Sequence, residues 1–450
     1  KIEVALENIF VSNGNVKMQT QKGKILFNGQ NVNIKLTNIK QSDDASKIPV
    51  AFEEFKIDAQ NVVVTANEFY EINAKKISAK NKTLNILGFH LNPIQNAKNY
   101  NAKNIFDFSA DELMAKNFVI SQDSLIVDQI DFVKPDLKVT STGKKTVEKK
   151  VEKEKEMNLK IGLKNINFNQ GKILVLQSNL QKTASIDNFN FKLNNIVFDK
   201  NTVKEKIPFR FTNHNIEAEN IYLKTDELQA LKIGKIKSEN QNITIDNFEM
   251  IPLGKSTHKD IIDIKTDKIL ITKNQSKYIG QQLNLNFAGI DVMNPKIKIF
   301  SAKHKSQAKK KTSSTPDFKA LIGKLNISNG TFKQITEGKE KLSVGKFDIN
   351  LNEIKSDKNI AKEDLPFTIK NHLITAKTIN LDAGKHYRLK LASLKNSGKQ
   401  TDLQNLEFLP KYSRDAFSKV IAKQEDLYTI RTKHISITDK NSKIGKNTAI

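Results

Sequence analysis

The stretch NVNIKLTNI, residues 31–39, returns twice in this chain, as NFNFKLNNI at 188–196 and as KFDINLNEI at 346–354. In each copy, three large apolar side chains alternate with Asn, Asp or Lys, and an Ile follows three positions after the third of them. Alternation with a period of two predicts a β-strand with one apolar and one polar face. The fold therefore depends on how three copies of this strand, repeated at a constant interval, are arranged in sheets.

Further landmarks keep the same interval, which indicates an internal triplication. All of them are spaced 157 to 159 residues apart: Gly14, Gly171 and Gly330; Pro49, Pro208 and Pro366; Pro93, Pro252 and Pro410; Ala59, Ala218 and Ala376. Between the copies the composition becomes charged and nearly free of apolar residues, which is typical of linkers. The sequence predicts β modules at 1–140, 159–300 and 318–450, and charged linkers at 141–158 and 301–317.

Each module is expected to hold about eight strands and almost no helix. The Asn-Gly and Asn-Gln-Gly sequences that end in Gly14, Gly171 and Gly330 predict tight hairpins, after which a new strand begins. The exception is KYSRDAFSKVIAK, residues 411–423, in which Ser413 can cap a short helix with apolar residues at helical spacing. The third module lacks a counterpart of VKPDLKV (133–139), so we expect the natural chain to continue beyond it.

The apolar alternation changes phase at the same places in every copy. Leu36 is followed by Ile39 rather than by an apolar residue two positions on, and Ile86 is followed in the same way by Phe89. A phase change of this kind predicts a β-bulge, and bulges bend and twist a sheet. A sheet bent at one place in every module would curl.

Composition narrows the class of protein. The chain of 450 residues carries 74 Lys and Arg against 49 Asp and Glu, a net charge of +25, but only four of the basic residues are arginines. Because readers of bases and phosphates favour Arg, this charge argues against a nucleic-acid partner. The absence of cysteine excludes disulfides and thiolate metal sites within these residues.

No segment approaches the roughly 18–20 apolar residues that span a bilayer. The chain begins at Lys1, inside an expected strand and without a signal-peptide pattern. We therefore expect a fragment of a protein whose membrane anchor and C-terminal end lie outside this sequence.

The apolar faces of the strands require a cover, and the chain has no helices to supply one. The predicted fold is mostly β, with three tandem modules of about 158 residues that form an elongated, curled β-sheet with an open hydrophobic groove. A closed solenoid and a sandwich of two sheets remain the alternatives.

The segment LQNLEFLPKYSRDAF…EDLYTIRTKHISI, residues 403–437, and the phrases LIGKLNISNG and IGLKNINFNQG resemble the large AsmA-like proteins of the bacterial envelope (TamB/YhdP type), in the form found in Bacteroidota. The resemblance covers the chain as a repeat pattern and includes no catalytic signature. It implies a β-groove similar to that of bridge-like lipid-transfer proteins. It also implies a periplasmic protein anchored in the inner membrane, with phospholipid acyl chains and the inner and outer membranes as partners.

Apolar bulk is the property that recurs through all three copies. The predicted groove-lining residues are Val32, Ile34, Leu36, Ile86, Phe89, Leu91, Phe189, Phe191, Leu193, Ile245, Phe248, Met250, Phe347, Ile349, Leu351, Leu403, Leu406 and Phe408. Histidines and carboxylates do not recur in this way: His214 and His372 are equivalent, but the first copy has Phe55 there. We therefore predict no catalytic residue, no metal site and no cofactor.

These observations predict a protein that is not an enzyme. We expect it to bind lipid acyl chains in a hydrophobic β-groove and to support phospholipid transport between the inner and outer membranes. The alternative is a structural or adhesive β-repeat array, in which the same side chains form a dry core and no ligand is bound.

Overall fold

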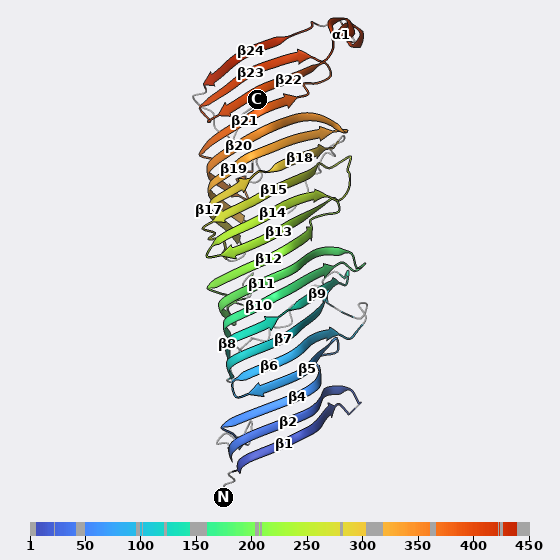
Figure 1. The fold of residues 1–450 in the computed structure, drawn as a ribbon, viewed down its shortest axis with the longest axis vertical. Helices are drawn as coiled ribbons and strands as arrows, with labels where there is room; N and C mark the ends of the chain where they lie inside the picture. Colours follow the sequence, from blue (N-terminus) through green and yellow to red (C-terminus); the bar gives the residue numbers. More distant parts are fainter. Residues whose placement is uncertain are drawn as a thin grey trace. The chain divides into compact units, whose positions relative to one another are not determined.

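The computed structural model describes residues 6–21, 23–41, 50–95, 100, 102–120, 124–144, 160–202, 207, 209–279, 282–302, 318–360, 366–421, 423 and 426–438. These residues form strands almost throughout, with one short α-helix near the C-terminus (Figure 1). The predictions of a mostly-β chain and of one short helix in the third copy are confirmed. The chain divides into two compact units, Lys1–Asn220 and Ile221–Ile450.

The first unit is a mixed sheet that follows the chain order. Its strands are β1 (Leu6–Gln19), β2 (Ile25–Gln41), β3 (Val50–Ala51), β4 (Glu54–Thr65), β5 (Tyr70–Lys80), β6 (Thr83–Pro93), β7 (Asn104–Ile120), β8 (Ser124–Val133), β9 (Asp136–Ser141), β10 (Lys160–Leu176) and β11 (Lys182–Phe198); β12 (Asn213–Lys224) contains the boundary. Strands β2, β4, β5, β6 and β7 pair antiparallel in that order. β8 and β9 both pair antiparallel with β7 and parallel with β10.

The second unit repeats this plan. It contains β13 (Gln229–Glu239), β14 (Asn242–Pro252), β15 (Ile261–Thr272), β16 (Lys277–Ile279), β17 (Gln282–Met293), β18 (Lys296–Ser301), β19 (Phe318–Thr336), β20 (Lys339–Asp357), β21 (Asn371–Leu381), β22 (Tyr387–Asn396), β23 (Gln400–Pro410), α1 (Arg414–Val420) and β24 (Ile430–Thr438). β17 and β18 pair antiparallel with β15 and parallel with β19, as β8 and β9 do with β7 and β10.

These parallel pairings explain why charged segments separate the copies. A parallel pair requires a crossover connection, whereas an antiparallel pair can be joined by a tight turn. The crossovers from β9 to β10 and from β18 to β19 contain the predicted linkers 141–158 and 301–317, most of which lies outside the described residues. Pro49 and Pro208 also lie outside them, whereas Pro93, Pro252 and Pro410 each end a strand, as expected.

The prediction of hairpins at the three glycines is wrong. β1, β10 and β19 each run straight through Gly14, Gly171 or Gly330, and the register with the partner strand shifts on both sides of the glycine. These shifts are β-bulges, in which one strand carries an extra residue. The residue before each glycine has a left-handed backbone, which the Asn or Gln there tolerates.

The phase changes of the apolar pattern are confirmed, but their predicted cause, a bulge, is wrong. Leu193 pairs with Ile166 and Ile196 pairs with Leu163, so the register is kept and both strands change side together. The residue between them, Asn195, has φ +51°, and the equivalent Asn38 and Glu353 have φ +50° and +51°. A residue with left-handed backbone angles changes the direction of its strand, and the strand paired with it bends at the same position.

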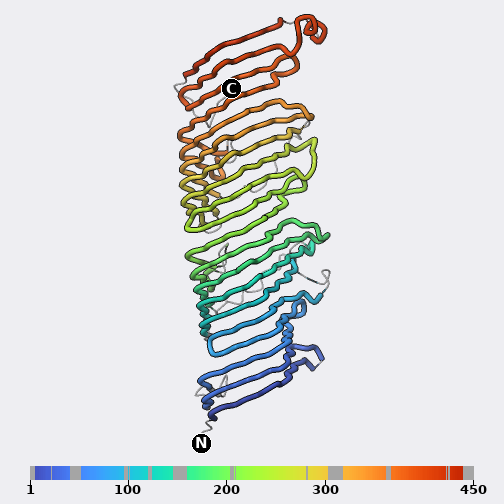
Figure 2. Tube along the Cα trace, viewed as in Figure 1, coloured from blue at the N-terminus to red at the C-terminus, as the bar shows by residue number. Residues whose placement is uncertain are grey.

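Left-handed residues recur in the three copies at four steps of the module. With φ between +47° and +61°, they are Asn13, Gln170 and Asn329; Asn38, Asn195 and Glu353; Asn61, Asn220 and Thr378; Gly88, Asn247 and Asn405. Strands bent at matching positions coil the sheet, as the trace in each unit shows (Figure 2). The architecture is a β-solenoid, and the open hydrophobic groove expected from the sequence is wrong.

Candidate functional site

The predicted lining residues of the first unit lie on one apolar face of the sheet. Ile34 pairs with Val11 and Ile57, and Ile86 pairs with Ile77 and Leu113 on its two neighbouring strands. Val32, Ile34 and Ile86 also meet in one hydrophobic cluster that is centred on buried residues of β2, β4 and β5. Side chains predicted from separate strands are therefore neighbours in space.

The second unit carries the same kind of face. Ile349 pairs with Ile327 and Ile374, and Ile245 pairs with Ile236 and Ile269. A few polar partners interrupt the face: Leu351 lies opposite His372, Phe248 opposite Thr266, and Leu406 opposite Thr432. At other positions, such as Leu403 with Leu394 and Ile435, the pairing brings apolar side chains together.

An aromatic ladder crosses the apolar face of the first unit. Successive ring centroids are 4.8 to 6.4 Å apart, and Phe132 and Phe168 are stacked with an interplanar angle of 3°. The ladder consists of Phe89, Phe108, Phe132, Phe168, Phe189 and Phe191, on β6, β7, β8, β10 and β11. Sequence reasoning missed the three rings on β7, β8 and β10, because they lie outside the two strands compared between copies. The alternation of apolar and polar residues in FDF (106–108), IDF (130–132) and INF (166–168) could have identified them.

Most side chains of the apolar face are partly shielded from solvent, and few of them are fully buried. Of the eighteen predicted lining side chains, Val32, Leu193 and Phe347 are buried, the remaining fifteen are half-buried, and none is exposed. A dry core would bury most such side chains fully. Half-buried apolar side chains that adjoin one another on the face of each unit form a candidate contact surface.

Aromatic side chains close one edge of this face in two of the copies. Tyr100 is 1% exposed, and its ring centroid lies 5.1 Å from that of Phe69 and 5.7 Å from that of Tyr70. In the third copy, Phe417 of α1 takes a comparable position against His386 and Tyr387, with centroids 5.6 and 6.1 Å away. The helix begins as expected, because the Ser413 hydroxyl accepts a hydrogen bond from the Ala416 backbone N–H. Tyr100 was not predicted, since it stands alone in a polar loop.

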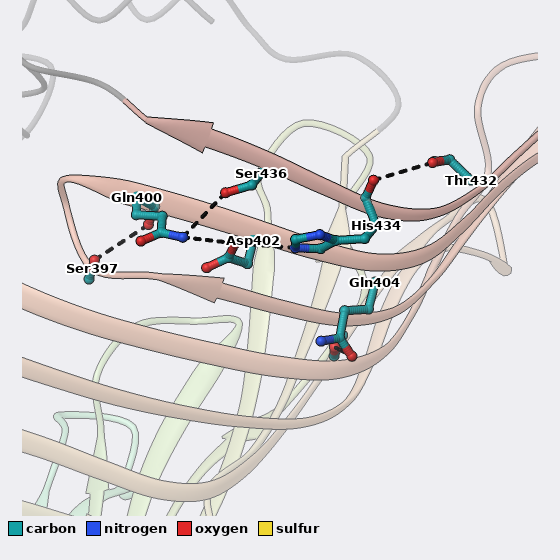
Figure 3. A network of polar contacts seen from close by, with 8 residues as sticks. Ser397, Gln400, Asp402, Gln404, Thr432, His434 and Ser436 are labelled. Carbon is teal, nitrogen blue, oxygen red and sulfur yellow. Dashed lines mark hydrogen bonds and ion pairs between the residues drawn. The ribbon is translucent and has the colours of Figure 1, made fainter.

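The opposite face of the sheet is polar and is linked by ion pairs between strands. Lys265 pairs with Glu249 at 3.2 Å, and Lys298 pairs with Asp263 at 3.6 Å. Figure 3 shows this surface on β23 and β24, where the Gln400 amide donates to Asp402 at 3.1 Å and to the Ser436 hydroxyl at 3.2 Å. Exposed pairs of this kind contribute little individually, about 0–1 kcal/mol, and they keep this face in water.

Several carboxylates of the polar face are held in their charged form. Hydrogen bonds from Lys341 and then Lys411 lower the pKa of Asp382 from its ordinary value of 3.8. The pKa of Asp402 is lowered first by the Ser436 hydroxyl, and also by His434, whose Nε2 lies 3.3 Å away. These arrangements stabilise surface charge.

Two histidines contact polar side chains of neighbouring strands. His90 lies 2.8 Å from Asp107 across β6 and β7, while His372 hydrogen-bonds Asn396. Within the described ranges, no group of three or more His, Asp or Glu side chains has an arrangement that could hold a metal ion. Over the same part of the chain, no helix has the length and apolar character needed to cross a membrane.

Neither protein-family models nor curated proteins match this chain. The features available for a functional inference are therefore its own: in each unit, an apolar face, a polar face and the loops at the edges of the sheet. What the structure supports by itself is a mostly-β protein with a long mixed sheet.

Proposed function

We propose that this chain binds the acyl chains of lipids along the apolar face of its coiled sheet, and that it thereby supports phospholipid transport between the inner and outer membranes of a bacterial envelope. The apolar face of each unit carries the proposal, because fifteen of the eighteen predicted positions on these faces are half-buried. The eighteen residues named from the sequence are the proposed lipid contacts.

The chemistry of the two faces suits such a ligand. An acyl chain is unbranched and flexible, and its contact with an apolar surface contributes roughly 0.8 kcal/mol for each buried CH₂ group. The aromatic ladder offers a row of rings that runs from strand to strand, so a chain lying across the strands meets Phe108, Phe132 and Phe168 in succession. No fixed polar partner is required inside the face, because a headgroup can remain in water.

The resemblance of the repeat pattern to the large AsmA-like envelope proteins supports the same function. Membership of that family would place the chain in the periplasm, with a membrane anchor in segments outside this sequence. Both statements are part of the proposal.

Native mass spectrometry of the purified chain, followed by lipid extraction, tests the proposal. We expect several phospholipids bound to each chain. A lipid-free mass together with a sharp cooperative melt would overturn the proposal and would favour the alternative, a structural or adhesive array with a dry core.

A pair of adjacent substitutions locates the contact. Ile349→Lys places a charge on the apolar face, while the matched control Asn350→Lys places the same charge on the opposite face, because neighbouring residues of a strand alternate sides. We expect Ile349→Lys to lower the number of bound lipids and Asn350→Lys to leave it unchanged. Equal lipid content in the two variants would contradict the assignment of the face.

A further inference from the structure

The second unit contains a cavity of about 790 Å³ at one end of its strands. Its apolar wall includes Ile261 of β15, Phe300 of β18 and Ile335 of β19, which form a row across three neighbouring strands. The segment 254–257, between β14 and β15, and the turn at Glu337 and Gly338 form the other walls. This volume falls within the roughly 300–1,000 Å³ of small-molecule sites.

The apolar row of this cavity, at one end of the strands, lies on the polar face of the sheet, opposite the proposed lipid face. Ile264, which pairs with the predicted lining residue Met250, is three positions from Ile261, so the two side chains point to opposite sides of β15. The register between β15 and β18 is regular over this stretch, and Phe300 lies directly opposite Ile261. The row is therefore an apolar site on a surface that elsewhere carries ion pairs such as Lys298–Asp263.

The rim of the cavity supplies polar groups that suit an anion. Lys255 is exposed at the rim, in the same segment as Ser256 and Thr257. The Ser256 hydroxyl oxygen accepts the backbone N–H groups of His258 at 3.2 Å and Lys259 at 3.0 Å, an arrangement that leaves its proton to donate to a ligand. An ammonium group and a donating hydroxyl at the mouth of an apolar cavity complement a negatively charged head on an apolar tail.

We propose that this cavity binds one long-chain anionic amphiphile, with its tail against Ile261, Phe300 and Ile335 and its carboxylate or phosphate head at Lys255 and Ser256. Net charge favours the same ligand, because basic residues outnumber acidic residues by 74 to 49. The proposed tail contacts Ile261, Phe300 and Ile335 lie on the side of the sheet opposite the proposed lipid face, so the two proposals can be tested independently.

Binding of palmitate to the purified chain, measured by isothermal titration and by cross-linking with a diazirine-bearing palmitate, tests this site. Phe300→Lys introduces a charge into the apolar row, and Leu373→Lys is its matched control, because both side chains are 36% exposed and Leu373 lies on β21, away from the cavity. We expect Phe300→Lys to weaken palmitate binding at this site at least about tenfold, because the introduced ammonium group would have to give up water to contact the tail. Leu373→Lys should bind as the unchanged chain does.

Further variants and ligands test the contact between the anionic head of the ligand and Lys255, and they distinguish this cavity site from the proposed lipid face. Lys255→Gln should weaken palmitate binding relative to the control Lys377→Gln, which replaces an exposed lysine of β21. Dodecyltrimethylammonium, which has a cationic head, and inorganic phosphate, which has no tail, should each bind more weakly than palmitate. Ile349→Lys should leave cross-linking at 254–261 intact while reducing phospholipid carried on the apolar face. Equal binding by Phe300→Lys and Leu373→Lys, or cross-links confined to the apolar face, would overturn the cavity site alone.

Discussion

The ring of Phe189 lies directly over Gly171 on the neighbouring strand, so closely that a Cβ atom added to the glycine would lie 2.3 Å from a ring carbon. Phe347 covers Gly330 in the same way, also at 2.3 Å. In the first copy the equivalent pair is Gly14 and the smaller Val32, and an added Cβ would meet its nearest atom at 3.5 Å. The glycine is needed where the opposite residue is aromatic, because the ring occupies the space of a side chain.

This relationship predicts that Gly171→Ala destabilises the protein by about 1–3 kcal/mol, the usual cost of forcing extra atoms into a packed site. Gly14→Ala should cost less, because its site has room. Urea denaturation of the two variants measures the difference. Phe189→Val, which reproduces the pair of the first copy, should remove most of the cost of Gly171→Ala in the double variant; equal destabilisation by the two alanines would contradict the explanation.

The left-handed residues that bend the strands should tolerate only side chains suited to that backbone. Asn405 has φ +50°, and the equivalent residue of the first copy is Gly88. Asn405→Val should destabilise the protein by about 1–2 kcal/mol, because a β-branched side chain clashes with the backbone in this region. Asn405→Gly is the control and should retain or raise stability. Thermal unfolding of both variants provides the test, and equal melting temperatures would show that this position is not constrained.

Truncation of rings on the apolar face distinguishes a lipid-contacting surface from a dry core. Phe347 is buried, and Phe347→Ala should cost about 3–5 kcal/mol. Phe191 is half-buried, so Phe191→Ala should cost clearly less in the lipid-free chain. If chemical denaturation gave both alanine variants the same loss, Phe191 would belong to a closed core.

The ion pairs of Asp382 predict an acid-sensitive component of stability. Because its pKa is lowered below 3.8 in the folded chain, the carboxylate stabilises the folded state fully above pH 3.8, and this contribution is lost as the pH falls through the folded pKa. Asp382→Asn should therefore reduce stability at pH 7 and flatten its decline at acid pH. The free energy of unfolding, measured from pH 7 to pH 3, tests this, with Asp136→Asn on β9 as the control. An unchanged acid profile would show that the two lysines do not hold this carboxylate.

The repeat and its local chemistry could be read directly from the sequence. Period-two alternation predicted strands and Ser413 predicted the start of the helix, because each of these signals is local. The constant interval of 157 to 159 residues predicted three copies, because a repeat shows in the sequence whatever the fold. The same alternation assigned Ile34, Phe191 and Ile349 to the apolar side of their strands, and the pairing brings apolar neighbours to each of them.

Tertiary structure decided the features that depend on a neighbouring strand. Asn-Gly is a hairpin signal by itself, yet Gly14 and Gly330 lie within continuous strands, because pairing along the whole strand outweighs the local preference for a turn. The phase change at Asn195 predicted a bulge, but the partner strand changes side with it, which no single strand can reveal. The coiling of the sheet, the burial of Tyr100 and the row of Ile261, Phe300 and Ile335 depend on register between strands, and register is set by pairing in three dimensions.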